Sequence, residues 1–408
     1  MAKDHIITGL DVGTSSIKAI AVLKDEETGI LEVVGRVNVP VFGVRRGVVF
    51  KTDQVSKSIG EVLFQLQSQT GHKIEDVYAN VGGSHLFSTP SHGTVVVSRA
   101  DGEISEEDIN RVIQVSQAFS LPSNRKILKV FPREFIVDGQ GNIKDPYDMK
   151  GMKLEVDVLA LCAFSPFLNN LSNAILTAGF QILDIVPSAL ASSRSILTPQ
   201  QKELGVCLVD IGAGTTDIAI YEEGDLIHTA VFPVGSERIT YDLAIGLKTD
   251  IETAEQIKKE FGSCISTSGK KKEKIELSRD GENKEILIFS HKMLIDIIEA
   301  RVCEIFDQVQ KELKKAPLKG SLPAGIVLTG GGSKLPKIVE LAKKELKLPV
   351  RIGKIQGLAG IDDDNLWSTA SGLILNEDDL EDKNFPNINQ LPGGIVRKIK
   401  NIIHNLLP

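Results

Sequence analysis

The stretch Asp11-Val12-Gly13-Thr14-Ser15-Ser16-Ile17-Lys18 decides the fold, because Asp210-Ile211-Gly212-Ala213-Gly214-Thr215-Thr216-Asp217 repeats its pattern much later in the chain. Each stretch follows an apolar segment, residues 5–10 and 205–209, and leads into another, residues 17–23 and 218–221. Short apolar segments that flank a glycine-containing turn are typical of two strands joined by a tight turn. The sequence therefore predicts one strand–turn–strand unit that occurs twice.

The residues of these turns are suited to phosphate. Glycine permits positive φ and close backbone approach, so successive N–H groups can point inward and cradle an anion. Lys18 adds a point charge, and an aspartate at the start of each turn, Asp11 or Asp210, can hold Mg²⁺ through its waters. Two facing turns would clamp the phosphates of one nucleotide between two lobes. The other groups of this predicted clamp are Gly13, Thr14, Ser15, Gly212, Gly214, Thr215 and Thr216.

The bulk composition excludes several classes of protein. A chain of 408 residues is expected to form at least two domains. Its formal net charge of −7 argues against general nucleic-acid binding, and its four cysteines have no metal-ligand spacing. We find no signal segment and no run of about 18 apolar residues, so we expect a chain that is neither secreted nor membrane-spanning, in a reducing cytoplasm.

Both halves of the chain contain the same parts in the same order. Residues 31–39 read as a strand, residues 54–69 as an amphipathic helix, and residues 77–81 as a strand that ends in a glycine pair. Residues 325–333 repeat that last feature, which favours duplication of one α/β unit. The loop Gly330-Gly331-Gly332-Ser333 would lie flat against an adenosine, with a following helix N-terminus near a phosphate.

An additional α+β module interrupts the first lobe at residues 84–163. It is expected to hold strands at residues 93–98, 127–137 and 153–163 and a helix capped by Ser105. Helices at residues 166–178 and 188–197 are expected to bridge the lobes. The predicted domains are therefore 1–83 and 164–197 for the first lobe and 198–375 for the second.

The end of the chain has a different character. Residues 376–392 are acidic and rich in turn formers, which is typical of a flexible tether. Residues 393–408 predict an amphipathic helix of roughly 21 Å, too short to span a bilayer. Its basic face suits anionic headgroups, although a helix docked on its own domain is the alternative. The apolar stripe comprises Ile395, Val396, Ile399, Ile402, Ile403, Leu406 and Leu407.

Two segments of the second lobe have more than one possible role. Residues 235–238, with Gly235, Glu237 and Arg238, and the helix predicted at residues 253–261 could face a nucleoside. Glu255 and Lys258 share one helix face, because they lie three residues apart. They could bond a ribose or an adenine, or form a surface ion pair.

The paired Asp-x-Gly turns and the terminal glycine loop resemble the superfamily of actin, sugar kinases and chaperone ATPases. Within it, residues 203–221, 324–331 and 350–353 resemble the bacterial cell-division family FtsA. The resemblance covers essentially the whole chain, including the inserted module and the C-terminal helix. It implies an α/β fold with two actin-like (ribonuclease H-like) lobes and an α+β subdomain inserted in the first.

The resemblance also implies a function. Proteins of this family bind ATP with Mg²⁺, polymerise, hold the FtsZ ring at the cytoplasmic face of the cell membrane at the division septum, and recruit later division proteins. Asp11 and Asp210 would lie at Mg²⁺, residues Gly13 to Ser16 and Lys18 at the phosphates, and Glu237, Glu255 and Lys258 near the ribose and base. Arg301 and Glu304 match charged positions at which the FtsZ C-terminal tail binds. The inserted module would be the surface for filament and late-protein contacts.

One departure from the superfamily bears on catalysis. Its filament ATPases usually place a Glu or Gln near a Pro-x-Ala turn to orient the attacking water, whereas Val186 precedes Pro187 here. Hydrolysis is therefore expected to be slow or absent, with ATP serving mainly to fix the lobe geometry. The alternatives are a small-molecule kinase, which needs a carboxylate base in the cleft, and an actin-like pilus-assembly protein.

Overall fold

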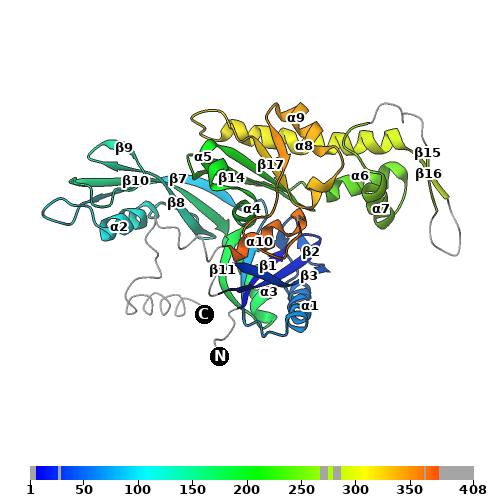
Figure 1. Ribbon diagram of the computed structural model, residues 1–408, viewed down its shortest axis with the longest axis horizontal. Helices are drawn as coiled ribbons and strands as arrows, with labels where there is room; N and C mark the ends of the chain where they lie inside the picture. The colour runs from blue at the N-terminus through cyan, green and yellow to red at the C-terminus, as the bar shows by residue number, and fades with distance from the viewer. Residues whose placement is uncertain (1–5, 26–28, 267–273, 279–285, 363, 376–408) are drawn as a thin grey trace. The chain divides into compact units, whose positions relative to one another are not determined.

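The computed structural model of the chain describes residues 6–25, 29–266, 274–278, 286–362 and 364–375 (Figure 1). The predicted tether and C-terminal helix lie outside these residues. The chain divides into two compact units: residues 1–90, 120–133 and 159–374 form the first, and residues 91–119 and 134–158 form most of the described second unit. In the described part of the chain, no helix combines the length and apolar character needed to cross a membrane.

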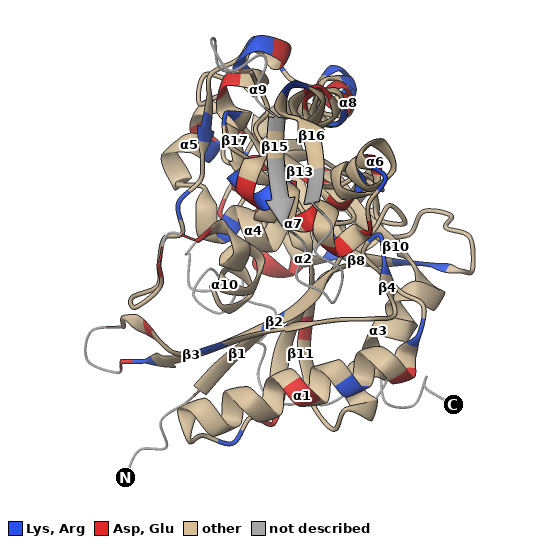
Figure 2. Cartoon of the chain, turned by 90° about the vertical axis from the view of Figure 1, so that its right-hand side faces the viewer, with Lys and Arg blue, Asp and Glu red and all other residues tan. Residues whose placement is uncertain are grey.

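The first lobe contains a five-stranded sheet in the order β11-β6-β1-β2-β3. Strands β1 (Ile6–Val12) and β2 (Ser16–Lys24) form an antiparallel hairpin, β3 (Leu31–Pro40) extends it, and β6 (Asp76–Val81) and β11 (Gln181–Pro187) run parallel to β1. Helix α1 (Thr52–Thr70) buries the predicted apolar face, namely Val55, Ile59, Val62, Leu63 and Leu66. Figure 2 shows acidic and basic residues interspersed along α1, as expected for the solvent side of an amphipathic helix.

The second lobe repeats this sheet in the order β18-β17-β12-β13-β14. Strands β12 (Val206–Ile211) and β13 (Thr216–Glu222) form the hairpin, β14 (Asp225–Phe232) extends it, and β17 (Ile326–Thr329) and β18 (Val350–Ile352) are parallel to β12. Each strand of one sheet therefore has a counterpart in the other, as the repeated motif predicts. The described helices of this lobe are α5 (Pro199–Leu204), α6 (Glu237–Leu247), α7 (Ile251–Phe261), α8 (His291–Lys315) and α9 (Ile338–Leu346).

Two short antiparallel pairs complete the lobes. Strands β4 (Val44–Arg45) and β5 (Val48–Val49) form a small hairpin in the first lobe. Strands β15 (Lys274–Ser278) and β16 (Ile286–Ser290) form an antiparallel pair that directly precedes α8 in the sequence.

The inserted module contains a four-stranded sheet in the order β7-β10-β8-β9. Its elements are β7 (Phe87–Val96), α2 (Glu106–Ser116), β8 (Arg125–Val137), β9 (Gln140–Ile143) and β10 (Lys153–Phe164). Ser105 caps α2 in a capping box with Asp108, as predicted from the sequence. Strand β7 begins at Phe87, earlier than the strand predicted at residues 93–98. The prediction missed the first half of this strand because that half is polar and shows no apolar alternation.

The structure corrects one prediction about the connecting helices. Helix α4 (Ser188–Ile196) contacts strands of both lobes and packs on α10 (Ser368–Ile374), where a Cβ at Gly372 would lie 1.7 Å from the Ala191 carbonyl oxygen. Helix α3 (Ser165–Thr177), in contrast, does not bridge the lobes: it packs on α1 and β11. Its apolar face joins the core of the first lobe only, through Leu171, Ala174 and Ile175.

Candidate functional site

A cleft of about 850 Å³ opens between the two hairpins, within the first compact unit. This volume lies in the range of pockets that hold small molecules. The predicted site residues that line the cleft are Asp11, Gly13, Thr14, Ser15, Ser16, Lys18, Asp210, Gly212, Thr215, Glu237, Glu255, Lys258, Gly330, Gly331 and Gly332. Segments that lie far apart in the sequence therefore converge on one site.

The two hairpins have the same backbone construction. The Gly13 N–H donates to the Ser16 carbonyl at 3.1 Å, and the Gly212 N–H donates to the Thr215 carbonyl at 2.9 Å. The hairpins also touch, because a Cβ built at Gly214 would lie 2.6 Å from Thr14 Oγ1. Glycine at this position therefore lets the two turns approach each other.

In the first hairpin, a lysine and an amide satisfy the aspartate. Lys18 Nζ donates to Asp11 Oδ2 at 2.9 Å, and Asn80 Nδ2 donates to Asp11 Oδ1 at 2.7 Å. Asn80 Oδ1 in turn accepts from the Val12 N–H at 2.7 Å. Asp11 is 6% exposed and Lys18 is 7% exposed, so this ion pair is buried. The sequence did not identify Asn80 as a site residue, although a polar residue in the apolar run 77–81 was the available signal.

In the second hairpin, two hydroxyls satisfy the aspartate. Ser192 Oγ of α4 donates to Asp210 Oδ2 at 2.5 Å, and Thr369 Oγ1 of α10 donates to the same oxygen at 3.3 Å. Burial raises the pKa of Asp210 to about 6; the Ser192 hydrogen bond opposes this rise, and the charge of Asp11 adds to it. A Cβ at Gly330 would lie 2.2 Å from Asp210 Oδ1, and Gly330 has a φ of +79°, so glycine is required there.

A second carboxylate lies directly beside Asp210. Asp217 is the cross-strand partner of Asp210 and is 4% exposed. Thr215 Oγ1 donates to Asp217 Oδ2 at 2.9 Å, whereas Oδ1 is buried without a hydrogen-bond partner among the described residues. Burial, followed by the neighbouring charge of Asp210, raises the pKa of Asp217 to about 8. The motif that revealed the hairpin contains Asp217, but the sequence did not mark it as a functional residue.

The cleft has the chemistry that Mg²⁺ and a nucleotide require. Asp11 and Asp210 supply hard oxygen ligands, and the glycine turns leave backbone exposed. Among the residues that the structure describes, no three His, Cys, Asp or Glu side chains are grouped closely enough to hold a metal directly. Asp11 and Asp210 are the carboxylates of the predicted Mg²⁺ site, and Mg²⁺ binding there stays a prediction.

Glu255 and Lys258 form an ion pair and line the cleft, and their contact with a ribose or an adenine stays a prediction. Lys258 Nζ lies 2.5 Å from Glu255 Oε2 and donates to Thr240 Oγ1 at 2.9 Å, and Thr240 Oγ1 donates to Glu255 Oε2 at 2.5 Å. All three residues line the cleft. The ion pair is thus a wall of the cleft rather than a feature of the outer surface. Burial lowers the pKa of Lys258, and the Glu255 hydrogen bond partly offsets this.

The remaining predicted residues are not among those that line the cleft. Thr216 Oγ1 donates to the Val234 carbonyl at 2.8 Å, and Ser333 Oγ donates to the Gly330 carbonyl at 2.7 Å. These two residues support the loops that line the cleft, and direct nucleotide contacts by Gly214, Thr216, Gly235, Arg238 and Ser333 stay predictions.

The helix predicted to follow the glycine loop is present, but it begins some residues after the loop. The loop itself forms a 3-10 turn, η1 (Gly331–Lys334), and α9 begins at Ile338, after Pro336 and the left-handed Lys337.

Four other residues of the cleft were not predicted from the sequence. Thr240, Lys334, Asn365 and Thr369 line the cleft, and they come from α6, η1, η2 (Asn365–Trp367) and α10. Lys334 directly follows the glycine loop, whereas the other three belong to no glycine-rich motif, so no local pattern distinguished them.

The charged pair predicted on α8 lies on a different face of the second lobe. Arg301 Nε donates to Asp242 Oδ2 of α6 at 2.8 Å, and Arg301 also pairs with Glu304. Two apolar residues of the same helices are exposed: Ile245 at 78% and Met293 at 41%. A surface that combines exposed apolar and charged side chains is thus present on α6 and α8.

The duplicated sheets and the cleft between their hairpins define the actin-like class of two-lobed proteins. The family described as "Cell division protein FtsA" matches residues 207–372, and the "SHS2 domain inserted in FTSA" matches residues 83–162. The cell division protein FtsA of Pseudomonas aeruginosa is 35% identical over 91% of this chain and 88% of its own length. That of Escherichia coli K12 is 30% identical over 90% of this chain and 89% of its own length. The chain therefore belongs to the FtsA family of cell division proteins.

Solved structures support the fold. A PilM–PilN type IV pilus biogenesis complex aligns with a TM-score of 0.65 at 16% identity, covering 91% of this chain and 98% of the other. MreB5 of Spiroplasma citri bound to ADP aligns with a TM-score of 0.56 at 15% identity, covering 95% of this chain and 99% of the other. At this level of identity the likeness establishes the fold alone. The predicted actin-like fold is confirmed.

Proposed function

We propose that the chain binds ATP with Mg²⁺ in the cleft between the two hairpins. The observation that carries this proposal is the convergence of Asp11, Asp210 and the glycine loop at Gly330 on one cavity of about 850 Å³. The similar MreB5 structure is bound to ADP, which supports nucleotide binding by this fold. Residues Gly13 to Ser16 and Gly212 to Thr215 would grip the phosphates from opposite sides. Glu237, Glu255 and Lys258 would face the ribose and base.

We further propose that the chain polymerises and tethers the FtsZ ring to the cytoplasmic face of the cell membrane at the septum. Family membership supports this role. The α6–α8 surface with Arg301, Asp242, Ile245 and Met293 offers a charged group beside exposed apolar side chains, which suits the FtsZ C-terminal tail. The amphipathic pattern of residues 393–408 supplies the membrane anchor. The inserted module is the proposed surface for filament contacts and for later division proteins.

The two alternative functions are less well supported. The full-length relatives reported above are cell division proteins, whereas the likeness to PilM is one of fold at 16% identity. A small-molecule kinase needs a carboxylate base in the cleft. The sequence shows no acid next to Pro187, yet Asp217 of β13 lines the cleft. The absence of an acid next to Pro187 therefore does not argue against a kinase. Membership in the FtsA family is the observation that favours a cell-division scaffold.

Cosedimentation with vesicles tests the proposed scaffold. The full chain, purified FtsZ and vesicles of anionic lipid are centrifuged with and without Mg²⁺-ATP. We expect both proteins in the pellet, loss of both after deletion of residues 393–408, and loss of FtsZ alone with Arg301→Glu. Lys73→Glu, an exposed first-lobe lysine paired with Glu75, is the charge-matched control and should retain FtsZ. Retention of FtsZ by Arg301→Glu would remove the proposed tail site, and full lipid binding after the deletion would remove the anchor.

A further inference from the structure

The side chain of Asn80 lies between two strands of the first sheet. The parallel pairing of β1 with β6 reaches Leu10 and Ala79. Two residues further along β1, the Val12 N–H donates to Asn80 Oδ1 at 2.7 Å, and Asn80 is only 4% exposed. Because a backbone N–H can only donate, the amide oxygen of Asn80 must face Val12. The Nδ2 group of the amide is therefore directed toward Asp11, to which it donates at 2.7 Å.

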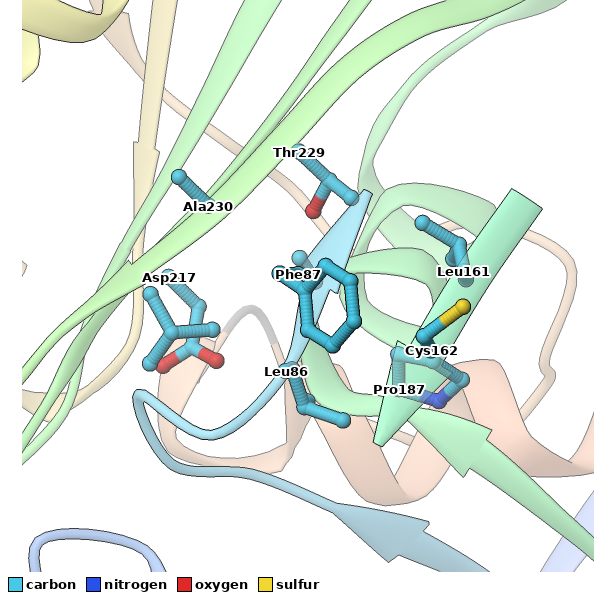
Figure 3. A pocket seen from close by; sticks show the side chains of 10 residues that line it. Leu86, Phe87, Leu161, Cys162, Pro187, Asp217, Thr229 and Ala230 are labelled. Atoms are coloured by element: carbon cyan, nitrogen blue, oxygen red, sulfur yellow. The ribbon is translucent and has the colours of Figure 1, made fainter. Parts of the chain in front are cut away.

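The Nδ2 group of Asn80 has a second acceptor, on helix α4. It donates to Ser188 Oγ at 3.1 Å, and Ser188 is the first residue of this helix. Ser188 is buried and lines the main cleft, whereas its neighbour Pro187 lines a different, small cavity (Figure 3). Asn80 therefore connects the aspartate of the first hairpin with the first turn of α4.

The same helix also reaches the aspartate of the second hairpin. Ser192 Oγ donates to Asp210 Oδ2 at 2.5 Å, and Ser192 is fully buried. Ser188 and Ser192 are four residues apart in α4, so they lie on one face of the helix, one turn from each other. One face of α4 therefore holds Asp210 directly and Asp11 through Asn80.

The need to satisfy buried polar groups explains only part of this arrangement. A buried carboxylate requires hydrogen-bond donors wherever it lies. That requirement does not explain why one helix serves two aspartates that come from separate sheets and line the same cleft. Mg²⁺ demands near-ideal octahedral geometry, and the groups that orient its ligands typically contribute about 10–100-fold to metal affinity. A shared support for both carboxylates is suited to a single metal ion.

We propose that helix α4 positions both aspartates for one hydrated Mg²⁺ bound together with ATP. It acts on Asp210 through Ser192, and on Asp11 through Ser188 and Asn80. The inference rests on the proposed binding of Mg²⁺-ATP and goes beyond it, because it assigns positioning roles to three residues outside the predicted clamp. Each of the three acts through an aspartate. Their loss therefore weakens the part of ATP binding that depends on Mg²⁺ and leaves the part that does not.

Calorimetric titration of a non-hydrolysable ATP analogue into the full-length chain, once in excess Mg²⁺ and once in EDTA, tests the proposal. For the wild-type chain, Mg²⁺ should lower the Kd. In Asn80→Ala and in Ser192→Ala, the Kd in Mg²⁺ should rise about tenfold, whereas the Kd in EDTA should change less than about threefold. Asn170→Ala is the matched control: it removes an amide of the first lobe that donates to the Val49 carbonyl outside the cleft, and it should keep both constants.

The titration in EDTA separates positioning from a merely structural role. A variant that only loosens the cleft would bind the analogue more weakly in both titrations, and that result, or an unchanged Kd in Mg²⁺, would overturn the proposal in either variant. Asn80→Ser, whose hydroxyl is too short to reach Asp11, replaces Asn80→Ala if that variant does not fold. Equal binding by the wild-type chain in Mg²⁺ and in EDTA would overturn the proposal and leave nucleotide binding intact. Failure of the wild-type chain to bind the analogue would overturn nucleotide binding as well, so the failures are distinguishable.

Discussion

The β1–β2 and β12–β13 hairpins share a backbone and differ in how they satisfy a buried aspartate. In the first hairpin, Lys18 gives Asp11 a full positive charge at 2.9 Å. In the second, Asp210 receives only hydroxyl donors from Ser192 and Thr369, and its cross-strand partner is another acid. The first hairpin is therefore electrostatically complete without a ligand, whereas the second carries uncompensated acidity toward the cleft.

This difference gives the two copies of the strand–turn–strand unit different electrostatic properties. Burial raises the pKa of both Asp210 and Asp217, and a cation bound in the cleft would favour their charged forms, so the second hairpin is the one expected to respond most to Mg²⁺. The donors to Asp210 come from α4 and α10, and α4 contacts the strands of both lobes. The second hairpin thus connects the site with the helices between the lobes.

The largest expected effect is loss of the cation in the first hairpin. Lys18→Met leaves Asp11 buried beside Asn80 without a countercharge. We expect the free energy of unfolding to fall by about 3–5 kcal/mol, because breaking a buried ion pair leaves a charge uncompensated. Urea denaturation without nucleotide measures this effect. Lys57→Met on the exposed face of α1 is the control, with a change of less than about 0.5 kcal/mol. Similar costs for the two variants would mean that the first hairpin does not need its lysine.

The second effect is a pH dependence that belongs to the other hairpin. The pKa of Asp217 is about 8 in the folded chain and near 4 when unfolded, so the folded state binds the extra proton between these values. Stability without Mg²⁺ should therefore fall as pH rises through this window, by about 2 kcal/mol between pH 6.5 and 8. Asp217→Asn should remove most of that slope in urea titrations, while Asp184→Asn retains it. An unchanged slope in Asp217→Asn would contradict the raised pKa.

A smaller effect is expected at the donor to Asp210. Ser192→Ala removes a hydrogen bond of 2.5 Å to a carboxylate and leaves Thr369 as the remaining donor. The expected cost is about 1.5 kcal/mol, the lower end for a bond to a charged group. Ser193→Ala is the matched variant on the same helix, since Ser193 bonds the neutral Tyr221 hydroxyl at 2.6 Å. Thermal or urea denaturation should show a larger loss for Ser192→Ala; the reverse order would argue that Asp210 is not charged.

The smallest effect concerns the single donor to Asp217. Thr215→Val keeps the shape of the side chain and removes the hydrogen bond of 2.9 Å to Asp217 Oδ2. We expect a loss of about 1 kcal/mol at pH 8.5 and less at pH 6.5, because the Oδ2 atom of a protonated Asp217 is a neutral acceptor, and a hydrogen bond to it is weaker than one to a carboxylate. Denaturation at the two pH values checks this. A cost that is independent of pH would indicate that Asp217 does not change its charge over this range.

Much of the fold followed from local patterns. The repeated Asp-x-Gly turns, the apolar face of α1 and the Ser105 cap all rest on residues close together in the chain. The role assigned to α3 failed because a helix pattern shows which face is apolar, but not which core receives it. Strand β9 was missed because Gln140–Ile143 is short and mostly exposed, so it lacks the alternation that marks a half-buried strand.

The site was predictable where glycine and aspartate occur in motifs, and unpredictable where long-range contacts assemble it. Asn80, Ser192 and Thr369 reach the aspartates from strands and helices far away in sequence. Asp217 lies within a quoted motif, yet its importance depends on its cross-strand neighbour and on an oxygen without a donor. The sequence shows no acid directly before Pro187, whereas in the fold Asp217 of β13 lines the same small cavity as Pro187.

Calorimetric titration of Mg²⁺-ATP into the full chain tests the central claim, that the two hairpins form one nucleotide site. We predict a single site per chain with Mg²⁺-dependent affinity, and a loss of at least tenfold in affinity, about 1.4 kcal/mol, for Gly330→Ala, whose Cβ would meet Asp210. No heat of binding for the wild-type chain, or unchanged affinity in that variant, would contradict the account.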